Sequence, residues 1–136
     1  MFNIRDEYVS LYKNSPSSLY SVLYQLYFMR KKDVEYGFNM FKQLTYKIDN
    51  HKVDKDIFIK MHDKMTYIKK GTSHIINDIY KDEISALKAK KSYILINSNK
   101  NYTEFFNLLF MQGIDYFVCD FNNNDYFFLS SLKVLV

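Results

Sequence analysis

The stretch YILINSNKNYTEFFNLLFMQGIDYFVCDFNNNDYFFLSSL, residues 93–132, decides the fold class of this chain. Its first four residues are apolar or aromatic and predict a strand, while Thr103 and Gly113 are typical N-terminal and C-terminal residues of a helix that lies between them. Residues 114–121 and 125–132 are again strand-like, and the run of asparagines between them predicts a hairpin turn. We therefore expect a β-α-β-β unit in this part of the chain.

The preceding part of the chain, residues 1–91, has apolar residues at helical spacing throughout and predicts a bundle of about five helices. We expect the β-α-β-β unit, residues 92–136, to pack on this bundle in a single α+β domain of residues 1–136. The expected helices are a short one ending near Asn14, one over residues 16–31, one capped by Asp33 that reaches Ile48, one opened by Asp54 or its neighbours and stopped by Gly71, and one capped by Thr72 or Ser73 that includes Leu87. The last two predict an antiparallel helical hairpin joined at Gly71.

The composition is that of an ordinary globular domain. With 136 residues and 48% hydrophobic side chains, the chain is long enough to bury a core without disulfides or a structural metal. Its one cysteine, Cys119, excludes an intramolecular disulfide framework and favours a reducing compartment. The longest uncharged run, Asn14–Met29, is shorter than the roughly 20 residues of a membrane-spanning helix, and no secretory signal is visible. We expect a cytoplasmic protein with no membrane segment and no cofactor.

Residue usage is skewed toward amino acids with AT-rich codons. The chain has 17 lysines against 2 arginines, together with 13 tyrosines, 12 phenylalanines and 12 asparagines. We hypothesise an AT-rich genome, such as that of a phage, another virus, a low-GC bacterium or a protist. The scarcity of arginine argues against sequence-specific recognition of nucleic acid, because lysine cannot copy the bidentate contacts of arginine.

Residue types that carry catalysis do not form any of the common catalytic motifs. The three histidines are 11 and 12 residues apart, which is wrong for a metal-binding pair on one helix, and three glycines are too few for a phosphate-binding loop. Cys119 is expected to pack in the interior. We therefore expect a protein that is not an enzyme and has no metal site. A small nuclease or transferase built on Asp115 and Asp120 is the remaining enzymatic alternative, although strand residues five apart face opposite sides.

Three tyrosines, Tyr20, Tyr24 and Tyr27, recur at helical spacing on a predicted helix without a charged face. The pattern fits core packing and an interface about equally well, since interfaces are enriched in aromatic residues and depleted in charge. We interpret the chain as a non-enzymatic regulatory protein that binds a protein partner, forms a homodimer, and is encoded by a phage or virus as a host-directed factor. These tyrosines are its predicted interface residues.

The uneven charge indicates an alternative function. Residues 51–100 carry 11 lysines and 6 acidic residues, whereas residues 101–136 carry 1 lysine and 4 acidic residues. The alternative is a nucleic-acid-binding accessory protein whose predicted helical hairpin contacts phosphates. Its candidate residues are Lys64, Lys69, Lys70, Lys88, Lys90 and Lys91. A solvated face explains the same lysines, several of which lie at predicted helix C-termini, where they complement the helix dipole.

Overall fold

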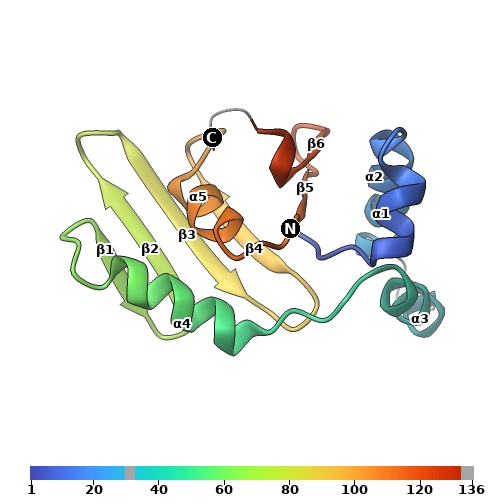
Figure 1. Ribbon diagram of the computed structural model, residues 1–136, viewed down its shortest axis with the longest axis horizontal. Helices are drawn as coiled ribbons and strands as arrows, with labels where there is room; N and C mark the ends of the chain where they lie inside the picture. The colour runs from blue at the N-terminus through green and yellow to red at the C-terminus, as the bar shows by residue number, and fades with distance from the viewer. Residues whose placement is uncertain (30–32, 133–136) are drawn as a thin grey trace.

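The structure is a computed structural model that describes residues 1–29 and 33–132 (Figure 1). Within these residues it contains five α-helices and two antiparallel sheets, so the predicted α+β class is confirmed. Residues 30 and 31 of the second predicted helix and residues 133–136 of the predicted β-α-β-β unit lie outside the described residues. The helices are Asp6–Tyr12 (α1), Pro16–Tyr27 (α2), Val34–Leu44 (α3), Asn50–Met61 (α4) and Glu104–Phe110 (α5), and a short 3-10 helix, Leu129–Ser131 (η2), follows the last strand. The strands are Tyr67–Lys70 (β1), Ser73–Asp78 (β2), Glu83–Ala89 (β3), Ile94–Ser98 (β4), Phe117–Asp120 (β5) and Asp125–Phe128 (β6).

Strands β1 to β4 form an antiparallel sheet in chain order, and helices α4 and α5 pack on one of its faces (Figure 1). Buried and more exposed residues alternate along β3, from buried Glu83 to buried Ala89, as in a strand that has one face toward the core. Helix α4 begins after Asp49, whose side chain accepts the backbone N–H of Lys52 at 3.2 Å as an N-cap. The face that α4 buries consists of Val53, Ile57 and Met61.

The predicted helical hairpin is wrong, because residues 67–89 form strands β1 to β3. The fourth predicted helix is the shorter α4, and the residues of the fifth form β2 and β3. Ile76 and Leu87 matched a helical spacing, but they are buried on the same face of two adjacent strands. A few apolar residues cannot distinguish the two periods. Gly71, predicted to end a helix, lies instead in the tight β1–β2 connection with a φ of 61°, a conformation that favours glycine.

The elements β4, α5, β5 and β6 follow one another in the predicted order, and α5 has the predicted ends. The Thr103 hydroxyl accepts the backbone N–H of Phe105 at 3.3 Å, and Gly113 follows the helix with a φ of 78°. The strands do not form one sheet, however, because β4 pairs with β3 whereas β5 pairs with β6. The predicted arrangement, a helical bundle followed by a β-α-β-β unit that packs on it, is therefore not confirmed.

The first two residues connect the two sheets. The α-amino group of Met1 donates to the carbonyl of Ile94 at 2.7 Å, and the Ile94 N–H donates to the Met1 carbonyl at 2.9 Å. Phe2 and Phe117 exchange an equivalent pair of bonds, at 2.9 and 2.8 Å. Mutual pairs of this kind are those of antiparallel strands, so Met1 and Phe2 act as a short strand between β4 and β5 (Figure 1).

Apolar side chains form two clusters on opposite faces of the short Met1–Phe2 strand and its neighbouring strands. Met1 belongs to the first and Phe2 to the second, because successive strand residues point to opposite faces. We call the first cluster the α4–α5 core, since it lies between the four-stranded sheet and these helices. We call the second the α2 core. Its buried residues are Phe2, Ile4, Leu19, Tyr20, Leu23, Leu44 and Phe117.

Candidate protein-binding site

Helix α2 holds the predicted interface tyrosines against the second sheet. It begins after Ser15 with Pro16 at its first position, as the sequence predicts, and contacts α1, α3 and β6. Leu19 and Leu23 are buried in the α2 core, which fixes the orientation of the helix. The same orientation places the three tyrosines at different depths.

Tyr20 is a buried residue of the α2 core. Its ring stacks on Tyr126 with 4.8 Å between centroids, and its hydroxyl donates to the side-chain oxygen of Asn124 at 3.2 Å. Burial, with smaller contributions from neighbouring charges, raises the pKa of Tyr20 above its ordinary value of 10.0. Tyr20 therefore ties α2 to the β5–β6 hairpin and offers little surface to a partner.

Tyr24 and Tyr27 remain 42% and 44% exposed and lie beside two phenylalanines. The Phe28 ring is 4.8 Å from Tyr24 and 5.0 Å from Tyr27, and the Phe121 ring is 5.0 Å from Tyr27 and 5.4 Å from Phe28. Two of these pairs, Tyr27–Phe28 and Phe28–Phe121, are edge-to-face, an arrangement that aromatic rings favour. We call Tyr24, Tyr27, Phe28 and Phe121 the aromatic patch. It presents uncharged, mutually supported rings at the surface.

Two members of the aromatic patch were not among the predicted interface residues. Phe28 lies four residues after Tyr24, so helical spacing could have found it. Phe121 directly follows β5, and the sequence holds no signal that β5 would approach α2.

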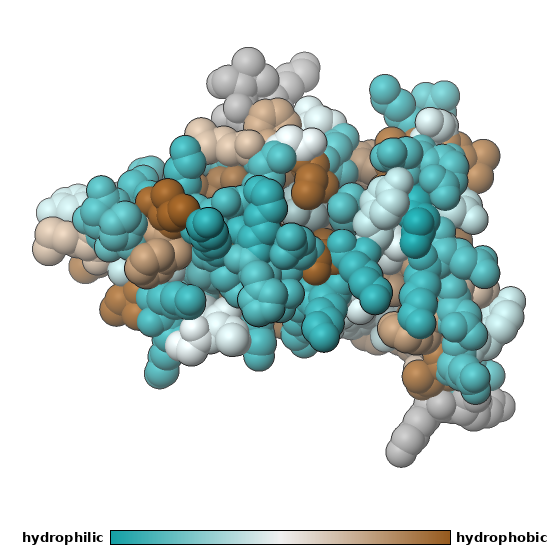
Figure 2. Space-filling view, turned by 60° about the horizontal axis from the view of Figure 1, so that its bottom comes forward, coloured by the Kyte–Doolittle hydropathy of each residue, from teal (hydrophilic) through white to brown (hydrophobic). Residues whose placement is uncertain are grey.

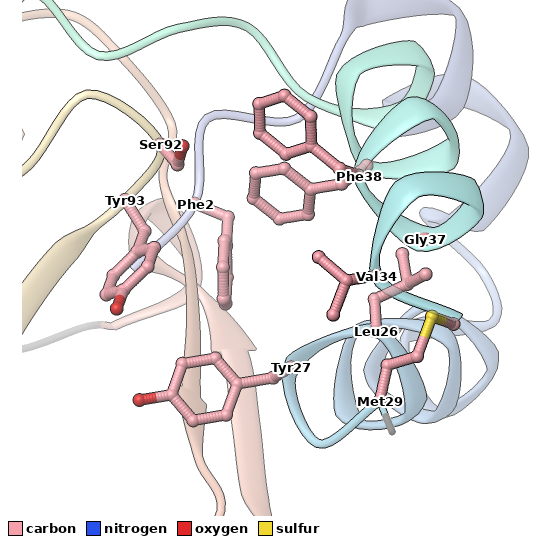
Figure 3. Close-up of a pocket in the computed structure, with 10 residues that line it drawn as sticks. Phe2, Leu26, Tyr27, Met29, Val34, Gly37, Phe38, Ser92 and Tyr93 are labelled. Carbon is pink, nitrogen blue, oxygen red and sulfur yellow. The ribbon is translucent and has the colours of Figure 1, made fainter. Parts of the chain in front are cut away.

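A cavity of about 490 Å³ adjoins the patch at Tyr27 (Figure 3). Phe2 and Tyr93 lie on one side of it, and Val34 and Phe38 of α3 lie on another. Desolvation, followed by the effect of neighbouring Tyr93, raises the pKa of Tyr27 above its ordinary value of 10.0. Tyr27 therefore lies between the other rings of the patch and a cavity that is lined mainly by apolar residues.

Five of the six candidate phosphate-binding lysines lie at one end of the four-stranded sheet. In an antiparallel sheet β1 and β3 end where β2 and β4 begin, which places Lys69, Lys70, Lys88, Lys90 and Lys91 at that end. Lys64 precedes β1 and lies at the opposite end. Figure 2, in which the lower side of Figure 1 comes forward, shows a mainly hydrophilic face with separate small groups of hydrophobic residues. The lysines therefore lie on strands and turns, and not on the predicted helical hairpin.

A buried histidine links α4 to the sheet, and sequence reasoning missed its partners. The ring of His74 is fully buried, with Nε2 2.7 Å from a carboxylate oxygen of Asp54 and Nδ1 2.7 Å from the hydroxyl of Tyr67. Both ring nitrogens therefore have a polar partner, a carboxylate at Nε2 and a hydroxyl at Nδ1. Because both nitrogens are engaged inside the core, this chain of hydrogen bonds is suited to holding elements together.

A buried carboxylate, Glu83, joins β3 to the start of α5. It accepts hydrogen bonds from the hydroxyls of Ser85 at 2.6 Å and Thr103 at 2.7 Å, and from the backbone N–H of Glu104 at 3.3 Å. These donors satisfy the charge that burial would otherwise make costly. Glu83 therefore stabilises the contact between β3 and the start of α5.

The remaining candidate catalytic residues are separated or inert. Asp115 accepts two bonds from Ser130 at one end of the β5–β6 hairpin, whereas Asp120 and Asp125 face each other across its other end. Burial raises the pKa of the Cys119 thiol to about 12. In residues 1–29 and 33–132, no three His, Cys, Asp or Glu side chains come together in a way that could hold a metal ion.

Comparisons with known proteins add no functional assignment: no family model matches the sequence, and no curated protein matches it either. None of the described helices combines the length and apolar character that crossing a bilayer requires.

Proposed function

We propose that this chain is a non-enzymatic interaction protein that binds a protein partner through the aromatic patch. The observation that carries the proposal is the packing of four aromatic rings, with centroids 4.8 to 5.6 Å apart, whose α2 members stay about half exposed. Aromatic residues dominate the well-packed centres of protein interfaces, and charged residues are depleted there. The free energy of such a surface is lower when a protein partner covers it than when it is exposed to water.

The mutual packing of the rings also lowers the cost of binding. Phe28 contacts three other members of the patch, and Phe121 contacts Tyr24, Tyr27 and Phe28. Side chains that are already restrained lose less conformational entropy when a partner covers them. The patch is therefore organised for binding before the partner arrives.

The chemistry of the interior supports a role without catalysis. Burial raises the pKa of Cys119 to about 12, which suppresses the thiolate that a nucleophile needs. His74 has both nitrogens engaged, and its ring is fully buried. For a protein encoded by a phage or virus with an AT-rich genome, we propose that the partner belongs to the host.

The test begins with affinity capture from a host lysate, followed by titration of the purified chain with the purified partner. We expect the double change Tyr24→Ala and Tyr27→Ala to weaken Kd about 30-fold or more, because buried aromatic hot spots contribute about 2 kcal/mol or more. Tyr80→Ala is the matched control, since Tyr80 is fully exposed in the β2–β3 connection. An unchanged Kd for the double variant, with an intact circular dichroism spectrum, contradicts the proposal.

A second copy of the chain is one partner that the patch could accept, which is the predicted homodimer. Sedimentation velocity over a range of protein concentrations tests it. Self-association that the same double change abolishes would make the patch a homodimer interface. A monomer at all concentrations would exclude self-association and leave binding to another protein.

The alternative function is binding of nucleic acid through the lysine-rich end of the sheet, and the clustering of five lysines there favours it. The test is a fluorescence titration of generic DNA and RNA at two salt concentrations. Changing Lys69, Lys70 and Lys88 to glutamate should reduce the salt dependence by about one unit for each phosphate that the variant no longer binds. Lys13→Glu on α1 is the control. Absence of binding at low salt would exclude this function.

A further inference from the structure

A groove of about 700 Å³ lies between the free edge of β4 and the free edge of β5. Ile96 and Ser98 line one side of the groove, and Cys119 and Phe121 line the other. The aromatic patch borders the same groove through Tyr27 and Phe28. The groove is therefore bounded by two strand edges and by the proposed binding surface.

The short strand of Met1 and Phe2 fills one end of the space between these edges. Met1 exchanges two backbone hydrogen bonds with Ile94 of β4, and Phe2 exchanges two with Phe117 of β5. Backbone groups point alternately to the two sides of a strand. The N–H and C=O of Ile96, two residues beyond Ile94, therefore face the groove, and those of Cys119, two residues beyond Phe117, face it from the opposite side.

These backbone groups have no hydrogen-bond partner among residues 1–29 and 33–132. The pairing also fixes a register. A strand that continues the line of Met1 past its amino group would place its first residue opposite Cys119 and its second opposite Ile96. Both edges would then be satisfied by one strand in the same antiparallel sense as Met1 and Phe2.

We propose that an extended segment of the partner binds in this groove as a β-strand, antiparallel to both β4 and β5. The proposal rests on the proposed function, because it specifies how the protein partner binds. The inserted strand would make the two sheets continuous, and its main-chain bonds would add to the side-chain contacts of the aromatic patch.

The two faces of the sheet define the side chains that the segment carries. Every second residue of the segment, counted from Met1, has the same orientation as Met1. These residues point toward Ile96, Phe106 and Phe127, which belong to or pack on the α4–α5 core. The others point to the side of the α2 core, where Tyr27, Phe28 and Phe121 line the groove. Beyond these residues the groove becomes polar, with Asn99, Asn101, Asn122 and Asn123 along it. We therefore infer a segment that is apolar on both faces next to Met1 and polar farther along.

The first experiment tests the groove without a partner. A short extension of alternating valine and threonine is placed directly before Met1, because a tether raises the effective concentration of a weak strand to the millimolar range. The control extension carries proline at the two positions next to Met1, which removes the N–H groups that pairing requires. Hydrogen exchange at individual amides is measured by NMR in both proteins.

We expect the valine–threonine extension to slow exchange of the Ile96 and Cys119 amides about tenfold or more relative to the proline extension. The amide of Ile94, which is already bonded to Met1, serves as the internal reference. Equal exchange rates for Ile96 and Cys119 in the two proteins would overturn the proposal.

The second experiment uses the purified partner and separates this proposal from the proposed function. If the partner binds as a strand, the valine–threonine extension competes with it and weakens Kd about tenfold or more, whereas the proline extension does not. A partner that binds both proteins with the Kd of the unextended chain overturns strand insertion and leaves the aromatic patch as the binding surface. If sensitivity to Tyr24→Ala and Tyr27→Ala is absent as well, the proposed function fails too.

Discussion

The α4–α5 core and the α2 core lie on opposite faces of the same strands, but they meet the solvent differently. The polar groups inside the first are enclosed and satisfied, with His74 bonded to Asp54 and Tyr67, and Glu83 bonded to hydroxyl and backbone donors. The second core continues outward into the aromatic patch, whose rings stay partly exposed. In the proposed function, the first face maintains the fold and the second supplies the binding surface.

The largest expected effect comes from a substitution that creates a cavity in the α4–α5 core. Phe105 is fully buried there, and Phe105→Ala should lower the free energy of unfolding by about 3–5 kcal/mol, from lost burial and the cavity left behind. Urea denaturation measures the change. Phe110→Ala, on the exposed side of the same helix, is the control. A loss below about 1 kcal/mol for Phe105→Ala would show that this core is not the main source of stability.

The second test concerns the strand that separates the two cores. Burial lowers the pKa of the Met1 α-amino group from 8.0 to about 6. Between these values the unfolded chain binds more protons than the folded one, so stability is highest above pH 8 and falls as the pH drops through 6. For protein with a free amine at Met1, we expect a loss of about 2–3 kcal/mol over this range.

Acetylation of the Met1 amine provides the control for that prediction, because it removes the titrating group and keeps an N–H that can donate to Ile94. Urea denaturation at several pH values should show a difference between the free and acetylated proteins that changes between pH 8 and 6. A constant difference would mean that the amine is not buried in solution.

A smaller effect is expected from the hydrogen bonds inside the α4–α5 core. Tyr67→Phe removes the hydroxyl that lies 2.7 Å from His74 Nδ1 and leaves this buried nitrogen without a hydrogen-bond partner. We expect a loss of about 1–2 kcal/mol in the free energy of unfolding. Tyr46→Phe, whose hydroxyl has one long and exposed contact at 3.4 Å, should change stability much less. Equal effects of the two changes would contradict a supporting role for the His74 hydrogen bonds.

The smallest effect on stability is expected at the rim of the α2 core. Phe28 is 55% exposed, so Phe28→Ala should cost less than about 1 kcal/mol of folding free energy. The same change should weaken partner binding measurably, because Phe28 contacts three other rings of the patch. Thermal unfolding and titration with the partner measure the two effects. A large stability loss would make Phe28 a core residue and blur the contrast between the two faces.

The elements that the sequence predicted well are those with strong local signals. Thr103 and Gly113 mark the ends of α5, and the asparagines after β5 mark the hairpin turn. In residues 67–89 the local signals conflict: Ile76 and Leu87 fit a helical period, although they are buried on neighbouring strands. These residues form strands in a sheet that α4 and α5 cover on one face. The alternation of buried and exposed residues along β3 results from that packing.

The candidate site was predictable only where it lies on one helix. Tyr24 and Tyr27 share α2, so their spacing in the sequence predicted that they lie close together on one helix face. Phe121 joins them from a segment almost a hundred residues later, and the Asp54–His74 contact likewise depends on how α4 packs against β2. Contacts of this kind follow from tertiary packing, which local patterns in one sequence do not reveal.

The pairing of Met1 with Ile94 and of Phe2 with Phe117 also has a consequence for synthesis of the chain. Met1 and Phe2 are synthesised about a hundred residues before Ile94 and Phe117, their hydrogen-bond partners. The strand between the sheets therefore cannot form until most of the chain has emerged, and contacts so distant in sequence slow folding. Until then Ile94 and Phe117 also lie on unpaired strand edges, so a nascent chain exposes longer edges of β4 and β5 to chaperones than the finished protein exposes at Ile96 and Cys119.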